Sequence, residues 1–511
     1  MAVARTRSVT LVGVTGRTVE VEADVGNGMA GIHLIGLPDT ALSEARERVR
    51  SAVVNSRYPW PDARITVSLF PASLPKRGSQ FDLAIAVAIL GAAGFVPAER
   101  VAGPFFLGEL GLDGRLRPVR GVLPAVLGAA EHPEVTVVVP AANAAEAALV
   151  PDVKVVPVAD LRQLVEWLRR GDDPPRHSVQ DAPSPPRSAA VPTVDLADVV
   201  GQPVARRALE VCAAGNHNLW MLGPPGTGKT LLAERLPTLL PRLHLDHALE
   251  VTAIHSVAGV LPPDSPTIDR PPFVSPHHTA TAAAIIGGGS TVVRPGAVSL
   301  AHRGVLFMDE APEFPRHVLD SLRQPLESGK VTVARSAGSV TFPARFILVL
   351  AANPCPCAQP QDQSGGCQCT PTLRRRYLGR LSGPLLDRID MKVTVARSSR
   401  RELMADRQFV ETSATVAARV LLARERAAAR FDGTPWRTNA EIPSSALHTR
   451  FRPSEAAMKP ITTCLDSGTL SARGLDRVVR VAWTLTDLAG KDRPDEAETS
   501  AALALWLGMS G

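Results

Sequence analysis

The chain has 511 residues, of which 45% are hydrophobic and 21% charged, and it carries a formal net charge of +6. Its longest apolar run, Leu83 to Pro97, is shorter than the roughly 18 residues of a membrane span and predicts a buried core helix. Met1 to Asp24 lacks the apolar centre of a signal peptide, so we expect a cytoplasmic protein. The positive charge favours an anionic partner such as nucleic acid, although arginine-rich proteins without such a partner have the same balance.

The amino-terminal part predicts an α/β domain over residues 1–170. A helix is expected to begin at Pro38-Asp39, because Leu42, Ala45, Val49 and Val53 then share one face. Apolar segments that predict strands are Ser8–Val14, Thr18–Ala23, Ile65–Leu69 and Val135–Val139.

The remaining chain divides into three further segments. Residues 171–193 are rich in proline, serine and charge without an apolar period, which predicts a linker. In residues 194–396 strands lead into glycine-rich turns and helices, as in a nucleotide-binding parallel sheet. Helical periods dominate residues 397–511, for example at Val416–Arg430 and at Leu475–Leu485, so this segment predicts a helical domain.

A phosphate-binding loop is predicted between the apolar segment Asn218–Leu222 and the helical run Leu231–Leu240. Glycines in such a loop turn backbone N–H groups toward phosphate oxygens. Lys229 would neutralise the β- and γ-phosphates of ATP, and Thr230 would ligate magnesium. A chance glycine loop is the alternative. The residues of this predicted site are Gly223, Pro224, Pro225, Gly226, Thr227, Gly228, Lys229 and Thr230.

Two later apolar strands end in polar residues that complete an ATP-hydrolysing site. After Gly304–Met308, Asp309 is expected to hold the magnesium shell and Glu310 to activate the attacking water; a solvated acidic turn is the alternative. After Phe346–Ala351, Asn353 is expected to sense the γ-phosphate or position the water.

Two arginines are further candidates for this site. Arg388 is a candidate arginine finger that a neighbouring subunit would receive, and Arg473 begins a helix that could reach the same phosphate. Either arginine could instead form a surface ion pair.

The motifs resemble one family over nearly the whole chain, the magnesium-chelatase-like AAA+ ATPases called YifB or ComM. This resemblance implies an AAA+ P-loop NTPase core with a helical lid, a homo-hexameric ring, and ATP with Mg²⁺ bound between subunits. The segments that carry it are Gly201–Glu210, Gly223–Thr230, Ser275–Thr279, Gly287–Gly289, Arg294–Gly296, Ser299–Glu310, Arg323–Glu327, Asn353–Cys357 and Ser382–Asp390.

The resemblance also implies two insertions that face a central channel, one over Ser256–Ala297 and a hairpin of Lys330–Ala334 and Ser339–Ala344. The basic candidates for phosphate contact there are Lys330, Arg335 and Arg294.

The family resemblance implies a DNA helicase that promotes branch migration in recombination or natural transformation, with single-stranded or branched DNA as its partner. Two alternatives remain: a metal-insertion motor like the ATPase subunit of magnesium chelatase, and a protein-remodelling ATPase.

The amino-terminal domain resembles the fold of the Lon protease domain and RadA (ribosomal S5 domain 2-like), most clearly at Leu107–Val119. Aligned to that pattern, Gln80 stands where a peptidase has its serine and Leu123 where it has its lysine. Neither side chain can perform nucleophilic catalysis, so we expect a domain without peptidase activity. Ser79 is one residue out of register.

Four cysteines, Cys355, Cys357, Cys367 and Cys369, form two close pairs around a short polar loop. This spacing suggests a tetrahedral, structural zinc site. Disulfides, or free structural thiols, are the alternatives. Cys212 and Cys464 lie in apolar helical surroundings and predict core packing.

Overall fold

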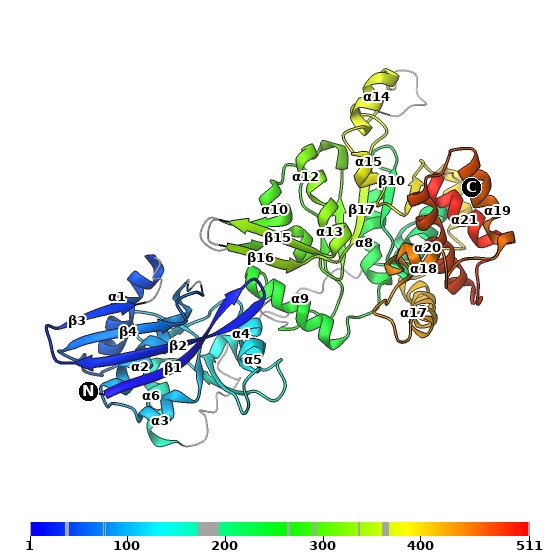
Figure 1. Ribbon diagram of the computed structural model, residues 1–511. Helices are drawn as coiled ribbons and strands as arrows, with labels where there is room; N and C mark the ends of the chain where they lie inside the picture. Colours follow the sequence, from blue (N-terminus) through cyan, green and yellow to red (C-terminus); the bar gives the residue numbers. More distant parts are fainter. Residues whose placement is uncertain are drawn as a thin grey trace.

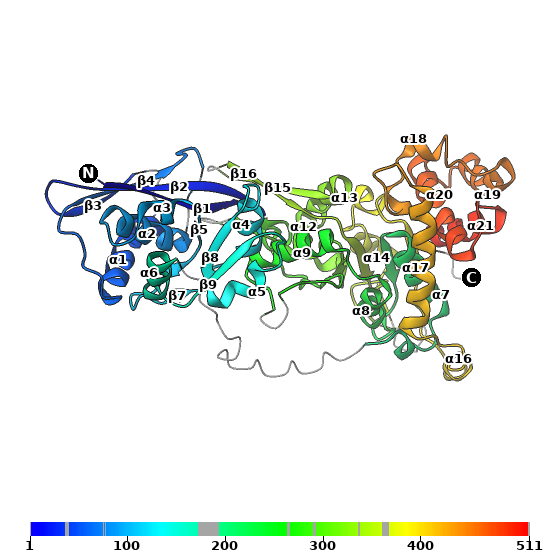
Figure 2. The same cartoon turned by 90° about the horizontal axis from the view of Figure 1, so that it is seen from below.

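The computed structural model describes residues 2–35, 40–74, 76, 78–171, 194–262, 266–289, 293–335, 338–359 and 367–508. The predicted linker, 171–193, lies outside them except for Gly171, as do Pro38 and Asp39. An amino-terminal α/β unit, a central α/β unit and a helical unit follow one another along the molecule (Figure 1; Figure 2). Within the described ranges no helix has both the length and the apolar composition to cross a membrane.

The amino-terminal unit contains a seven-stranded sheet in the order β3-β4-β2-β1-β5-β8-β9. Val138 of β8 packs in one core cluster and Val137 and Val139 in another, because neighbouring residues of a strand face opposite sides of the sheet. Its elements are β1 Ala2–Val12, β2 Thr15–Gly26, β3 Gly31–Ile35, α1 Thr40–Asn55, β4 Arg64–Phe70, η1 Ser79–Phe81, α2 Asp82–Ala92, α3 Ala98–Ala102, β5 Phe105–Phe106, β6 Glu109–Leu110, β7 Leu116–Arg117, α4 Val122–Ala129, β8 Thr136–Pro140, η2 Ala141–Asn143, α5 Ala144–Ala147, β9 Lys154–Val158 and α6 Leu161–Arg170.

The strands predicted for this unit are confirmed as β1, β2, β4 and β8. The predicted core helix is confirmed as α2, all of whose residues are buried. It stops at Ala92, five residues before the predicted end. Gly94 adopts a left-handed conformation with φ 79°, which ends a helix without the steric cost that a side chain would add.

The central unit is built on a parallel sheet in the order β11-β14-β17-β10-β18. Its elements are η4 Leu196–Asp198, α7 Pro203–Gly215, β10 Leu219–Leu222, α8 Lys229–Leu239, α9 Leu245–Ala258, β11 Phe273–Val274, α10 Ala282–Ile286, β12 Gly287–Gly288, β13 Arg294–Pro295, α11 Ala297–Leu300, β14 Val305–Met308, η5 Ala311–Glu313, α12 Arg316–Ser321, α13 Arg323–Ser328, β15 Lys330–Arg335, β16 Gly338–Pro343, β17 Ile347–Ala352, α14 Pro371–Leu378, α15 Gly383–Leu386 and β18 Met391–Thr394.

The two predicted insertions fare differently. The hairpin is present as β15 and β16, paired antiparallel from Lys330↔Pro343 to Arg335↔Gly338. The segment Ser256–Ala297 is not a simple insertion, because it contains the edge strand β11, which pairs with β14 of the central sheet. Among the described residues of this segment, β12 and β13 form a separate two-stranded hairpin.

The helical unit packs directly on the central unit. One core cluster joins Val393 of β18, Val211 of α7, Val420 of α17 and Ala482 of α20. The helical unit therefore shares a continuous apolar core with the sheet. Its elements are α16 Arg400–Asp406, α17 Ser413–Arg430, η6 Asn439–Glu441, α18 Ser444–Leu447, α19 Glu455–Asp466, α20 Ala472–Ala489 and α21 Glu496–Leu507.

The amino-terminal unit contacts the central unit through α4 and α5 on one side and α9 on the other. Ala253 of α9 belongs to the same core cluster as Val122 of α4, and the hydroxyl of Ser256 donates a hydrogen bond to the buried carboxylate of Glu146. Val14, in the β1–β2 turn, packs against the core cluster that contains Val331 of β15 and Phe342 of β16. This contact places the β15–β16 hairpin beside the amino-terminal unit (Figure 1).

Candidate nucleotide site and cysteine cluster

The loop predicted to bind phosphate begins where β10 ends, beside the carboxyl end of β17. Leu222 pairs with Ala352, so Gly223 and Asn353 each follow directly on one of two neighbouring parallel strands. Met308, the last residue of β14, pairs with Leu350, which brings Asp309 to the same edge of the sheet. Open parallel sheets bind ligands at this edge.

Lys229 is buried at the first turn of α8, with 7% of its surface exposed. Its Nζ donates hydrogen bonds to the carbonyl oxygens of Gly223 (2.7 Å) and Pro224 (2.8 Å) and to Oδ1 of Asn353 (3.1 Å). Burial lowers the pKa of Lys229, while the negative charges of Asp309 and Glu310 raise it. The ammonium group is therefore surrounded by oxygen acceptors in a partly desolvated position, where its charge acts strongly on a bound anion.

Glycine is favoured at three positions of this loop for two different structural reasons. Gly226 and Gly228 adopt left-handed conformations with φ 74° and 88°, a region that disfavours other residues. A Cβ on Gly223 would lie 2.2 Å from the carbonyl oxygen of Val395, so only glycine allows this close approach.

Thr230 and Asp309 are in direct contact: the threonine hydroxyl donates a hydrogen bond of 2.8 Å to Oδ2 of Asp309. Adjacent oxygen ligands of an octahedral Mg²⁺, each at about 2.1 Å, lie about 3 Å apart. The two side chains therefore fit a magnesium shell completed by waters and phosphate oxygens.

Glu310 is exposed and has a left-handed backbone with φ 50°, a strained conformation typical of functional sites in residues other than glycine. Its Oε2 lies 3.5 Å from Nδ1 of His278, whose ring lies at a tilt of 32° against that of His277, with 4.1 Å between centroids. His278 was not among the site residues predicted from sequence, although it lies in the Ser275–Thr279 motif that carries the family resemblance.

Arg388 and Arg473 lie together at the opposite edge of the sheet. Arg388 precedes β18, whose first residue pairs with the first residue of β10, and its guanidinium bonds Glu327 at 2.7 Å. Arg473 lies 3.4 Å from Asp387. Both arginines line a cavity of about 610 Å³ that also includes Arg477 and Arg480. The structure thus brings the two arginines to each other but not to Lys229 of the same chain.

The proposed channel residues are exposed where the structure describes them. Lys330 begins β15 and Arg294 begins β13, and both side chains are exposed. Arg335 ends β15, and its side chain lies outside the described residues.

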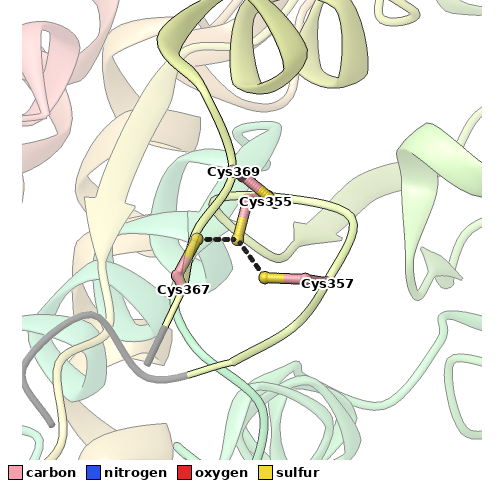
Figure 3. A group of neighbouring side chains, drawn as sticks. All are labelled: Cys355, Cys357, Cys367 and Cys369. Carbon is pink, nitrogen blue, oxygen red and sulfur yellow. Dashed lines mark hydrogen bonds between the residues drawn. The ribbon is translucent and has the colours of Figure 1, made fainter. Parts of the chain in front are cut away.

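The four clustered cysteines converge on one point between the end of β17 and the start of α14 (Figure 3). Their sulfur atoms all lie within 4.8 Å of one another. Cys355 is buried, Cys357 is exposed, and Cys367 and Cys369 are half-buried; all four are free thiols. By contrast Cys212 is buried in α7 and Cys464 packs against the same core, as predicted.

Comparison with protein families matches three consecutive stretches of the chain. Residues 21–143 match "Subunit ChlI of Mg-chelatase", residues 195–403 match "Magnesium chelatase, subunit ChlI", and residues 410–505 match "Magnesium chelatase, subunit ChlI C-terminal".

Three relatives align with nearly the full length of the chain. A Mycobacterium tuberculosis protein of uncharacterized function is 54% identical over 99% of this chain and 98% of its own length. Competence protein ComM of Haemophilus influenzae is 39% identical (96% of this chain, 95% of ComM), and YifB of Escherichia coli is 40% identical (94% and 92%). The 38 kDa subunit of magnesium chelatase from Rhodobacter capsulatus is 30% identical over only 34% of this chain and 53% of that subunit. The chain therefore belongs to the YifB/ComM family of magnesium-chelatase-like AAA+ ATPases.

Proposed function

We propose that this protein is a cytoplasmic, ATP-hydrolysing ring motor that acts on DNA, with residues 1–170, 194–396 and 397–511 as its domains. The main support for ATP hydrolysis is that Lys229, Asn353, Thr230 and Asp309 converge at one edge of the parallel sheet. These groups combine a buried cation, a neutral amide and a pair of magnesium-type ligands, as phosphoryl transfer requires.

Each residue has a defined task in this proposal. Lys229 and the backbone N–H groups of the loop hold the phosphates, while Thr230 and Asp309 hold Mg²⁺, which supplies positive charge to the phosphate oxygens. Glu310 accepts a proton from the attacking water, and Asn353 orients that water or the γ-phosphate.

Arg388 and Arg473 act on ATP bound by a neighbouring subunit. Their position at the edge of the sheet opposite Lys229 supports this, because a homo-hexameric ring can set the arginine edge of one chain against the phosphate edge of the next.

DNA is the substrate best supported by the relatives. The full-length similarity to competence protein ComM favours a helicase that promotes branch migration in recombination or natural transformation, and the exposed Lys330 and Arg294 suit contacts to phosphates. Metal insertion is less well supported, because the chelatase subunit matches only 34% of this chain.

The amino-terminal domain is proposed to be a Lon-like domain without peptidase activity. Gln80 donates a hydrogen bond to the carbonyl oxygen of Val9, and Leu123 is buried in a core. The Ser79 hydroxyl donates to Glu109, while Lys76 donates to the carbonyl oxygens of Pro71 and Leu74. Each potential nucleophile or base is thus engaged in structural contacts. Casein cleavage that disappears in Ser79→Ala would contradict this assignment.

The decisive experiment measures ATP hydrolysis with single-stranded DNA, duplex DNA or unfolded protein, together with branch migration of a synthetic four-way junction. We expect DNA to stimulate ATP hydrolysis. We also expect the parent chain, but not Glu310→Gln, to convert the junction into separate duplexes by branch migration. Stimulation by unfolded protein alone would replace the DNA proposal with protein remodelling. Equal hydrolysis by Lys229→Ala and the parent would refute the ATP site itself.

A further inference from the structure

The cysteine cluster has the dimensions of a metal site. Sγ of Cys355 lies 3.3 Å from Sγ of Cys357 and 3.3 Å from Sγ of Cys367, and no two of the four sulfurs are more than 4.8 Å apart. In a regular tetrahedron with zinc–sulfur bonds of about 2.3 Å, the sulfurs are about 3.8 Å apart. The observed separations bracket that value. They far exceed the roughly 2.05 Å bond of a disulfide.

The surroundings also suit a charged metal–thiolate centre. Arg374 donates a hydrogen bond of 3.4 Å from Nη2 to Sγ of Cys367. Its Nε is buried and has no hydrogen-bond partner among the described residues. Zn²⁺ with four thiolates carries a net charge of −2, and a neighbouring guanidinium compensates part of it, as groups around metal ligands commonly do.

The cluster joins two functional parts of the chain. Cys355 follows two residues after Asn353, whose amide contacts Lys229. Cys369 precedes Thr370, whose hydroxyl caps α14 by accepting from the N–H of Leu373. The helix α14 projects from the central unit (Figure 1) and exposes the side chains of Arg375 and Arg376.

We propose that Cys355, Cys357, Cys367 and Cys369 bind one structural Zn²⁺ that fixes the basic helix α14 to the loop after Asn353. The thiols release their protons to solvent as the thiolates ligate the metal. Four protein ligands fill the tetrahedron, so the ion holds the fold and leaves no position for a substrate. The binding site is independent of the nucleotide function, because it uses none of the residues assigned to ATP.

The test is metal analysis of the full chain purified without chelators. We expect one zinc per chain in the parent and in the control Cys464→Ser, which alters a half-buried cysteine outside the cluster. Zinc should be lost in the double variant Cys357→Ser/Cys369→Ser, which leaves the buried Cys355 in place. Iron with sulfide in place of zinc, a metal-free parent, or zinc retained by the double variant would each overturn the proposal.

Two further measurements use the parent chain and do not depend on the variant's folding. Co²⁺ added to metal-free protein should produce the visible absorption of tetrahedral thiolate coordination, and added Zn²⁺ should remove it. Trypsin should cleave within Arg374–Arg376 faster after a mercurial reagent has displaced the metal than before. Cobalt spectra without thiolate bands would contradict the coordination, and unchanged trypsin cleavage would contradict the anchoring of α14.

Discussion

The two edges of the central sheet carry different charged groups. The carboxyl edge has Asp309, Glu310 and the buried cation Lys229. The cavity at the amino edge is lined by Arg388, Arg473, Arg477 and Arg480 together with carboxylates such as those of Glu327, Asp387 and Asp390. Between the two edges lies β10, whose four residues span about 13 Å at roughly 3.3 Å per residue. In our proposal the first edge holds a nucleotide and magnesium, and the arginines of the second edge act on the phosphate of a neighbouring chain. Within one chain the two edges face apart, so in that proposal a complete site combines two chains.

The largest effect on ATP hydrolysis is expected from removing Arg388, the proposed arginine finger at the amino edge. Arg388→Ala should lower kcat for ATP hydrolysis by about 10³- to 10⁵-fold, the range for arginine fingers in other ATPases and GTPases. Mixing inactive Arg388→Ala with inactive Lys229→Ala should restore part of the activity, because some interfaces then combine an intact loop with an intact arginine. Steady-state hydrolysis across mixing ratios measures this.

A matched control for Arg388 is Arg316→Ala, which removes an exposed arginine paired with Asp320 on α12. Such surface pairs contribute about 0–1 kcal/mol, so kcat should stay near the parental value. Mixtures as inactive as their components would show that Arg388 does not act between chains.

Much of the carboxyl edge was predictable from sequence, because Gly223, Asp309 and Asn353 each directly follow a strand that shows as an apolar run. The amino edge was predictable only as separate arginines. Its organisation depends on contacts between residues far apart in the chain, such as Asp390 with Arg477 and His217 with Thr484. The two-residue strand β11 is too short to show a period, so the sequence pattern offered no correction to the insertion that the family resemblance implies for Ser256–Ala297.

A second prediction tests the carboxyl edge. Glu310→Gln keeps the size of the side chain but cannot accept a proton, so kcat should fall by about 10²- to 10⁴-fold while ATP binding is retained. Single-turnover hydrolysis and titration with a fluorescent ATP analogue separate the two. The neighbouring control Glu313→Gln alters an exposed pair with Arg380 and should leave kcat unchanged. Equal losses in both variants would remove Glu310 from its proposed role.

A third prediction concerns the support of the amino edge. Asp390 is buried and accepts hydrogen bonds from the N–H of Asn218 at 2.8 Å and from Arg477 at 2.9 Å. Replacing one partner of a buried ion pair typically costs about 3–5 kcal/mol. Asp390→Asn should therefore destabilise the contact between the sheet and α20, visible as a lower thermal unfolding temperature. An unchanged temperature would contradict this.

Protonation of the Asp390 carboxylate should make the stability of the folded protein fall at acidic pH. Burial alone raises the pKa of Asp390, but Arg477, His217 and the Asn218 N–H together hold that pKa below its usual range. Because the folded-state pKa is depressed, its stabilising contribution is present above the ordinary aspartate pKa of about 3.9 and is lost as the pH falls below it. The parent should lose stability over that acidic interval more steeply than Asp390→Asn, which urea unfolding at pH 7 and at acidic pH would measure.

The smallest effect on kcat is expected from removing His278, which lies beside Glu310 at the carboxyl edge. His278 approaches Glu310 to 3.5 Å from a partly exposed position, and exposed pairs of this kind contribute about 0.2–1 kcal/mol. His278→Ala should therefore lower kcat by at most about fivefold with KM for ATP little changed, since the histidine acts by orienting Glu310 rather than by holding phosphate. In the Glu310→Gln background the same substitution should have no further effect, because the group that it orients is already inactive. An equal, additive loss in both backgrounds would mean that His278 acts independently of Glu310, and the carboxyl edge would then contain a second group that contributes directly to catalysis.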